Sequence, residues 1–107
     1  LLQFSYAQTS SLTIKVVNSD SMNGINSALV FIDELNFADT ETDSYGVAYF
    51  ENVPLGKISI NIRKQGFKPY RGNFNVTNNP NHNSARIELV EISNHLHNRD
   101  SLERNKG

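Results

Sequence analysis

The sequence contains no cysteine, and this excludes a disulfide framework, a thiol nucleophile and a cysteine-based zinc site. It also carries almost no net charge, because 10 Lys and Arg side chains oppose 11 Asp and Glu side chains. A domain without a basic stripe lacks the electrostatic footprint that nucleic acid or an anionic membrane surface requires. We therefore expect neither of these partners, and the composition predicts no cofactor.

Long apolar runs are also missing from the sequence. No stretch reaches the roughly 18 residues that a membrane span needs, so we expect a mature chain without a transmembrane segment. The length of 107 residues predicts one domain, since domains typically hold roughly 100 to 200 residues. Disulfides or metals are normally needed only below roughly 40 residues, so packed side chains alone can form the core.

The first seven residues differ in character from the rest of the chain. Leu1, Leu2 and Phe4 are apolar, and small residues stand at Ser5 and Ala7, the two positions that a signal peptidase reads. We interpret residues 1–7 as the remnant of a secretory signal peptide, with an ordinary N-terminal extension as the alternative. The first interpretation predicts a secreted, periplasmic or outer-membrane-associated protein.

Apolar residues recur at every second position in several short stretches, which is the pattern of a half-buried β-strand. Strands are predicted at residues 12–17, 28–33, 36–42, 47–51, 57–63 and 70–76, and around Ile87 and Leu89. Outward-facing positions are expected at Thr13, Lys15 and Val17 in the first strand and at Lys57, Ser59, Asn61 and Arg63 in the fifth. Residues 28–33 are apolar at nearly every position, which is typical of a strand buried on both faces.

Short strands separated by turn signals predict an all-β domain, a seven-stranded Greek-key β-sandwich. Strand parity then predicts the core. The residues expected to be buried are Leu12, Ile14, Val16, Val30, Ala48, Phe50, Ile58, Ile60, Ile62, Phe74, Val76, Ile87 and Leu89. Residues 93–107 are mostly polar and are predicted to form a tail or linker.

Turn and core residues recur in a fixed order in the middle of the chain. The order is Thr42-Asp43 with Gly46, Ala48 and Phe50, then Asn52-Val53-Pro54-Leu55-Gly56, then Ile58, Ile60 and Ile62, then Gly66-Phe67. On these residues the chain, from Leu12 to about Ile92, resembles the carboxypeptidase regulatory-like domain, a transthyretin-like β-sandwich family. The resemblance places a domain at residues 8–92. The chain departs from the family pattern at Val53, where Leu is commoner, and between Asn23 and Ala28.

The resemblance implies a non-catalytic accessory module. Domains of this family lie beside metallocarboxypeptidase domains, at the N-terminus of outer-membrane TonB-dependent receptors, and within surface or secreted multidomain proteins. The residues that carry the resemblance agree with this, because they are turn formers and core residues rather than acids, bases and nucleophiles. The structural turn residues are Asp43, Gly46, Pro54, Gly56 and Gly66.

An acidic cluster is the best candidate for a ligand site. It contains Asp33, Glu34, Asp39, Glu41 and Asp43, and Ca²⁺ prefers six to eight oxygen ligands of the kind that such loops supply. The spacing does not match an EF-hand, because Ser44 stands where the invariant glycine is needed. Asp39, Glu41 and Asp43 are weak candidate metal ligands, and the alternative is a charged strand edge that deters pairing between sheets.

Enzymatic chemistry has little support in the sequence. Tyr70-Arg71-Gly72 is similar to part of the terminal motif of transthyretin-related hydroxyisourate hydrolases, but it lies in the middle of this chain. The three histidines, His82, His95 and His97, all fall late, in a turn and a tail. We therefore predict a protein that is not an enzyme, and we interpret the histidine pair as exposed polar residues rather than as metal ligands.

Exposed aromatic residues offer a second route to ligand binding. Tyr45, Tyr49, Phe67 and Tyr70 could form a platform for a glycan, although aromatics at alternating positions more often pack across strands. Asn75-Val76-Thr77 matches the N-glycosylation sequon, which matters only in a secreted eukaryotic chain.

Taken together, the sequence predicts a bacterial secreted or cell-envelope β-sandwich that supports a neighbouring domain or binds a partner protein. A glycan-binding or Ca²⁺-binding module is the alternative. Catalytic and cofactor-binding residues are not expected.

Overall fold

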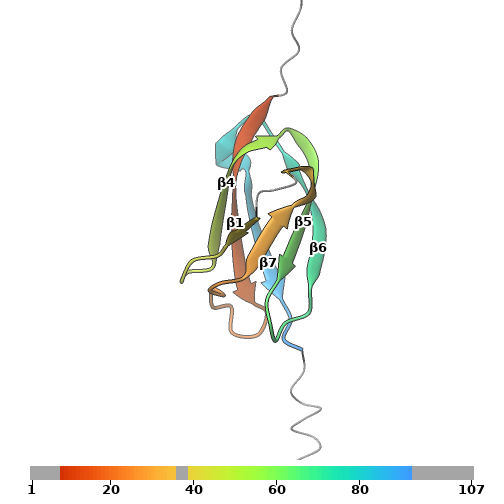
Figure 1. Ribbon diagram of the computed structural model, residues 1–107. Helices are drawn as coiled ribbons and strands as arrows, with labels where there is room; N and C mark the ends of the chain where they lie inside the picture. The colour runs from red at the N-terminus through yellow and green to blue at the C-terminus, as the bar shows by residue number, and fades with distance from the viewer. Residues whose placement is uncertain (1–7, 36–38, 93–107) are drawn as a thin grey trace, which may run out of the picture.

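The computed structural model describes residues 8–35 and 39–92, which fold into a sandwich of two β-sheets (Figure 1). The strands are β1 (Thr9–Asn18), β2 (Leu29–Ile32), β3 (Asp39–Glu41), β4 (Val47–Pro54), β5 (Gly56–Arg63), β6 (Tyr70–Val76) and β7 (Ser84–Leu89). Two 3₁₀ turns, η1 (Asp33–Leu35) and η2 (Pro80–His82), complete the described elements. The all-β class and the two-layer sandwich predicted from the sequence are confirmed.

The two layers differ in size and in strand direction. Sheet A has three strands in the order β4-β1-β7, and sheet B has four strands in the order β3-β2-β5-β6. Sheet B is antiparallel throughout. In sheet A, β1 pairs antiparallel with β4 but parallel with β7, from Thr13 opposite Ser84 to Asn18 opposite Leu89.

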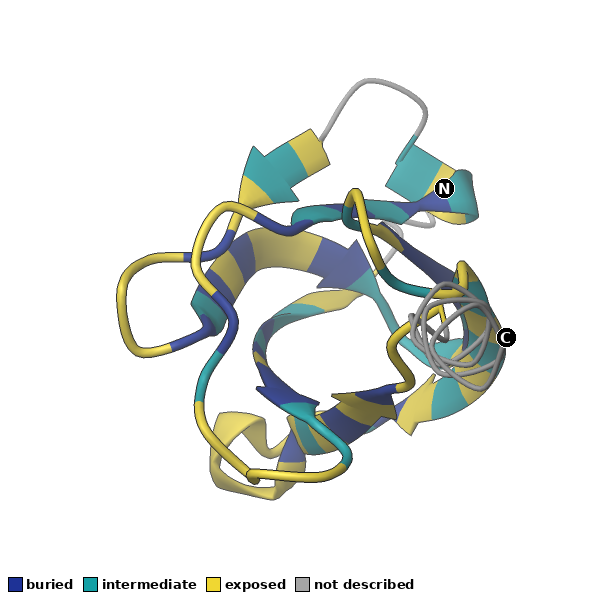
Figure 2. Cartoon of the chain, turned by 90° about the horizontal axis from the view of Figure 1, so that it is seen from below, coloured by how far each residue is buried: buried dark blue, intermediate teal, exposed yellow. Residues whose placement is uncertain are grey.

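The core lies between the two sheets, and Figure 2 shows the buried segments facing one another across it. Every residue predicted to be in the core is buried except Phe74, which is half-buried and packs against the core from the edge strand β6. An edge strand has a neighbour on one side only, so the other flank of an inward side chain stays near solvent. The core also contains Ile25, Ala28, Ile32 and Val53.

The prediction that residues 28–33 form a strand buried on both faces is wrong. β2 ends at Ile32, and its burial alternates, because Val30 and Ile32 are buried whereas Leu29 and Phe31 are half-buried. The outward face of sheet B is not covered by a further layer within the described residues, so those two side chains keep part of their contact with water.

Val17 and Asn61 were expected to face outward and be exposed, and both are buried. Val17 is covered because the chain folds back beside it after β1. The Asn18 N–H donates to the Asn23 carbonyl at 2.9 Å, and Val17 forms a bridge with Gly24. Asn61 is covered by charged side chains that lie over the outward face of sheet B.

Thr42 fastens the connection between β1 and β2 to the segment after β3 through its backbone and its hydroxyl. The buried Thr42 Oγ1 accepts a hydrogen bond from the Ala28 N–H at 2.8 Å and donates to the Ile25 carbonyl at 2.5 Å. Thr42 therefore satisfies two buried backbone groups that have left the sheet ladder.

Three predicted features lie outside the described residues. These are the signal-peptide remnant at residues 1–7, the tail at 93–107 with His95 and His97, and the start of the strand predicted at 36–42. Among the residues that are described, no helix is long and apolar enough to cross a membrane.

Candidate functional site

The Asp43 side chain builds the turn between β3 and β4. Its Oδ1 atom accepts hydrogen bonds from the Tyr45 and Val47 N–H groups, both at 2.9 Å, and its carbonyl accepts from the Gly46 N–H. The Val47 N–H has the largest effect on the carboxyl group, and these bonds hold the pKa of Asp43 below its ordinary value because they favour the charged form. Gly46 closes the turn with a φ angle of 86°.

The other predicted turn residues also mark changes of chain direction. Pro54 ends β4, and Gly56 opens β5 with a φ angle of 101°. Gly66, with a φ angle of 91°, lies in the turn in which the Phe67 N–H donates to the Lys64 carbonyl at 3.0 Å. Glycine adopts such angles without the steric cost that a side chain brings, so the two glycines suit these positions.

The structure distributes the acidic cluster over three places. Asp33 and Glu34 lie in η1 and bond to sheet B, Asp39 and Glu41 are exposed on β3, and Asp43 bonds within its turn. No group of three or more His, Asp or Glu side chains suited to holding a metal ion occurs within residues 8–35 and 39–92. A Ca²⁺ site at Asp39, Glu41 and Asp43 stays a hypothesis.

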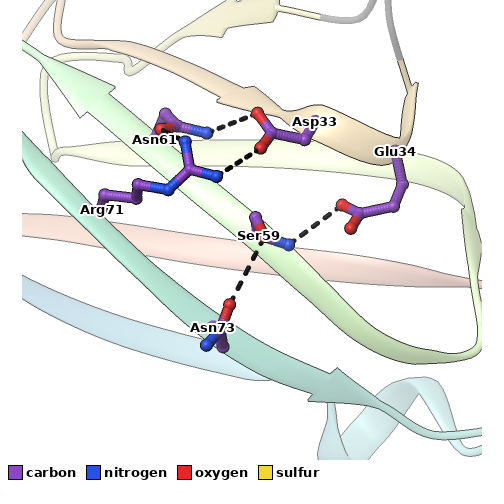
Figure 3. A network of polar contacts seen from close by, with 6 residues as sticks. All are labelled: Asp33, Glu34, Ser59, Asn61, Arg71 and Asn73. Carbon is purple, nitrogen blue, oxygen red and sulfur yellow. Dashed lines mark hydrogen bonds and ion pairs between the residues drawn. The ribbon is translucent and has the colours of Figure 1, made fainter.

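A closed ring of three polar side chains lies on the outward face of sheet B (Figure 3). The Asn61 amide donates to Asp33 Oδ1 at 2.7 Å, and the Arg71 guanidinium donates to Asn61 Oδ1 at 3.0 Å and to Asp33 Oδ2 at 2.9 Å. The ring joins η1, β5 and β6. It explains why an outward-facing asparagine is buried, and it neutralises the charge of Arg71.

Glu34 extends the polar network along β5 (Figure 3). β2 ends at Ile32, which lies opposite Ile60 of β5. The N–H group of Ser59, the residue before Ile60, therefore has no strand partner on the β2 side. Glu34 Oε1 accepts that N–H at 2.9 Å, and the Ser59 hydroxyl donates to Asn73 Oδ1 at 3.4 Å. A carboxylate thus replaces the missing strand backbone, and the part of the outward face formed by β5 and β6 is polar and ordered.

An open pocket of about 470 Å³ lies at one end of sheet B. It is lined by Ser27, Arg63, Lys64, Gln65, Phe67 and Pro69. The β5–β6 loop that forms its wall is fastened to the chain after β7, because the Lys68 N–H donates to the Val90 carbonyl and the Ile92 N–H donates to the Gly66 carbonyl, both at 2.8 Å. The wall of the pocket is therefore anchored to both sheets.

The charges are segregated along the chain, which the net charge conceals. Residues 16–56 contain no Lys or Arg, and residues 52–87 contain no Asp or Glu. In sheet B, the β3 edge carries Asp39 and Glu41. The opposite side carries Lys57 and Arg63 on β5, beside Arg71 on β6, whose charge Asp33 compensates. Counting charges in windows of the sequence reveals this pattern, whereas the total does not.

The aromatic residues do not form one platform. Tyr49 is exposed on the outward face of sheet A, and Tyr45 is exposed in the β3–β4 turn. Phe67 and Tyr70 instead pack against the core between the sheets. Four residues divided in this way cannot hold one sugar ring.

The groups considered for hydrolysis are also apart. His82 is exposed in η2, which follows the end of β6, whereas the pocket lies beside the start of β6. Arg71 is held by Asp33 and Asn61, and the Tyr70 ring lies over Gly72. His82 is therefore not part of the lining of this pocket.

No protein-family model and no curated protein sequence matches the chain. Solved structures do match in fold. The chain is similar to part of the Bacillus anthracis TIE protein (TM-score 0.60, 20% identity, 78% of this chain and 16% of that chain). It is also similar to part of BcpA, the major pilin subunit of Bacillus cereus (TM-score 0.55, 15% identity, 76% of this chain and 30% of that chain).

A third similar structure is the pilus adhesin RrgA from Streptococcus pneumoniae (TM-score 0.58, 13% identity, 80% of this chain and 15% of that chain). At these identities the likeness shows a shared fold. The chain spans between 15% and 30% of the length of these three proteins, so it matches only a part of each.

Proposed function

We propose that this chain is a non-catalytic interaction module of a bacterial secreted or cell-envelope polypeptide, and that it binds a partner protein or a neighbouring domain. The fold supports this, because a pilin subunit and a pilus adhesin contain domains of the same shape. The single observation that carries the proposal is the outward face of sheet B, which along β5 and β6 is polar and ordered by side-chain bonds, with acidic side chains on its β3 edge and Lys57 and Arg63 on β5.

Acidic side chains on β3 and basic side chains on β5 favour one orientation of a partner. Electrostatic complementarity contributes more to specificity and to the rate of encounter than to affinity. The Asp33, Asn61 and Arg71 ring keeps the middle of the face in a single arrangement. A partner therefore meets a surface that is already ordered, which lowers the entropic cost of binding.

The proposal includes the finer features expected from the sequence. The domain comprises residues 8–92, has the transthyretin-like Greek-key topology and belongs with the carboxypeptidase regulatory-like domains. The turn at Asp43 and Gly46 and the turn at Pro54 and Gly56 support this, because they lie where the resemblance expects them. A signal sequence before Gln8 would export the chain.

Site-specific photo-crosslinking tests the proposed function. A photoreactive residue replaces Asn75, which is exposed on β6 and faces outward from sheet B, in the full chain produced by its own cells. The matched control replaces Ser84, which is exposed on β7 in sheet A. We expect a discrete crosslinked polypeptide, or a crosslink to a neighbouring domain, from Asn75 and not from Ser84.

Equal crosslinking from the two positions, or none from Asn75, would contradict the proposal. The result is read by mass spectrometry of the crosslinked peptide, which identifies the partner residue as well as the partner.

A further inference from the structure

We propose that the pocket at the end of sheet B binds the carboxylate groups of an acidic peptide segment. The inference rests on the proposed interaction function and names the chemistry of the partner. It starts from the lining residues, which include Arg63 and Lys64 but no acid.

The two cations of the pocket have no internal partner. Among the described residues the one ion pair is Arg71 with Asp33, so Arg71 is compensated whereas Arg63 and Lys64 are not. Within the same residues, the side chains of Ser27 and Gln65 also make no hydrogen bond to the protein. Four of the polar side chains that line the pocket therefore have hydrogen-bonding groups available to a ligand.

Among residues 8–35 and 39–92, no acidic side chain lines the pocket. Glu91 pairs with Phe67 through the backbone, but its side chain is not part of the lining. Glu41 is on β3, opposite Leu29 of β2, and Leu29 in turn lies opposite Arg63. Within the part of the chain that the structure describes, the positive charge at the pocket is thus uncompensated and available to an anion. A guanidinium group binds a carboxylate through two parallel hydrogen bonds, which favours this anion.

The surroundings favour a peptide over a sulfated sugar. Phe67 and Pro69 give the pocket an apolar wall, against which the carbon atoms of a side chain can pack. Pro69 leads directly into β6, which among the described strands pairs only with β5. The open edge of β6 offers backbone N–H and carbonyl groups to an extended peptide. A polysaccharide has no matching ladder of backbone groups.

The test uses nuclear magnetic resonance titration of the full chain with a short peptide of consecutive glutamates. We expect shifts concentrated at Ser27, at residues 63–69 and along β6, with affinity that falls as salt is added. The double variant R63Q/K64Q should bind about tenfold or more weakly, because two charge-assisted contacts are lost. The control R86Q removes one exposed charge from β7 in sheet A and should bind like the wild type.

Three results would overturn the proposal. The first is an equal loss of affinity in R86Q, which would indicate attraction to the net charge alone. The second is a set of shifts outside the pocket and β6. The third is binding of a sulfated heparin fragment at the pocket without binding of the peptide. Unchanged unfolding midpoints of R63Q/K64Q verify that the variant is folded.

The two proposals can fail separately. If the glutamate peptide does not bind but Asn75 still forms its crosslink, the pocket proposal is wrong and the interaction function stands. If the peptide binds at the pocket but Asn75 forms no crosslink, the pocket proposal stands and the interaction function assigned to the face of sheet B is wrong.

Discussion

Asn83 is a buried side chain whose hydrogen-bonding capacity is fully used. Its Oδ1 atom accepts from the Thr77 N–H at 2.8 Å and from the Thr77 hydroxyl at 3.1 Å. Its amide nitrogen donates to the Thr77 carbonyl at 2.8 Å and to the Ser10 hydroxyl at 3.2 Å. One residue thus joins the end of β6 to the start of β1.

Replacing Asn83 with alanine should destabilise the fold by about 1 to 3 kcal/mol, because the partly buried N–H and carbonyl groups of Thr77 lose their partners. Urea unfolding measures the change. Asn81→Ala is the matched control, since Asn81 is exposed and its side chain makes no hydrogen bond within the described residues. Equal midpoints for the two variants would show that the Asn83 bonds add nothing to stability.

Asp43 gives the stability a dependence on pH. Its pKa in the folded state lies below the ordinary value of 3.8, so its charged form stabilises the fold above that pH. The contribution is lost as the pH falls through the folded pKa. Asp43→Asn keeps an acceptor oxygen but removes the charge.

The difference in unfolding midpoint between wild type and Asp43→Asn should therefore be larger at about pH 7 than at about pH 3. The other carboxyl groups are the same in the wild type and in the variant. The difference between the two unfolding midpoints therefore reports on Asp43 alone. A difference that stays constant with pH would contradict this account.

Turn chemistry made Asp43 and the glycines recognisable in the sequence, because their roles depend on residues close by. Nothing local distinguishes Asn83 from the other asparagines around it. Its burial depends on Ser10, which is distant in sequence, so the sequence alone does not predict it.

Two connecting segments cross at Gly24 and Gly46. A side chain on Gly46 would collide with the Val16 carbonyl, with Gly24 and with the Ile25 nitrogen, and a side chain on Gly24 would collide with the Tyr45 carbonyl. The close approach lets the β1–β2 connection lie against the β3–β4 turn. The Ile25 N–H and the Val16 carbonyl bond at 2.9 Å beside the crossing.

Gly46→Ala should be clearly more destabilising than Gly56→Ala. Both glycines have positive φ angles, which alone should cost about 1 to 2 kcal/mol. Space around Gly56 is open, whereas the crowding at Gly46 should add about 1 to 3 kcal/mol. Thermal unfolding of both variants gives the comparison, and equal losses would show that the crossing is loosely packed.

Alternating apolar residues predicted β5 and β6 well, because each strand has one face on the core and one toward water. The prediction for β2 was wrong, since its apolar residues include Leu29 and Phe31 on the outward face. The Asp33, Asn61 and Arg71 ring could not be predicted. It depends on the register between η1, β5 and β6, and no spacing along the chain encodes that register.

The sandwich as a unit depends on the residues where the two sheets meet. Ile60 is buried, and on sheet B it lies between Ile32 of β2 and Gly72 of β6. Ile60→Ala should be the most destabilising single truncation of the core, with a loss of about 2 to 5 kcal/mol.

Chemical denaturation of Ile60→Ala tests this expectation. The control is Ile92→Ala, because Ile92 is 54% exposed and its truncation should change stability by less than about 0.5 kcal/mol. An unchanged midpoint for Ile60→Ala would mean that the strand assignment of β5 is wrong.

The parallel pairing of β1 with β7 has a mechanical consequence. β1 begins at one end of the sandwich and β7 finishes at the other (Figure 1). Tension applied through the two ends of the domain therefore slides these neighbouring strands past each other. All the hydrogen bonds between them are loaded together, in shear, rather than broken one after another.

The resistance to force should consequently depend on direction. Single-molecule pulling between Gln8 and Ile92 should need a higher force than pulling between Lys57 and Asn75, which are paired at the open end of the β5–β6 hairpin and would peel it apart. Equal forces would contradict the shear geometry. A domain with this property can carry load between its neighbours along one axis while its hairpin remains easy to open.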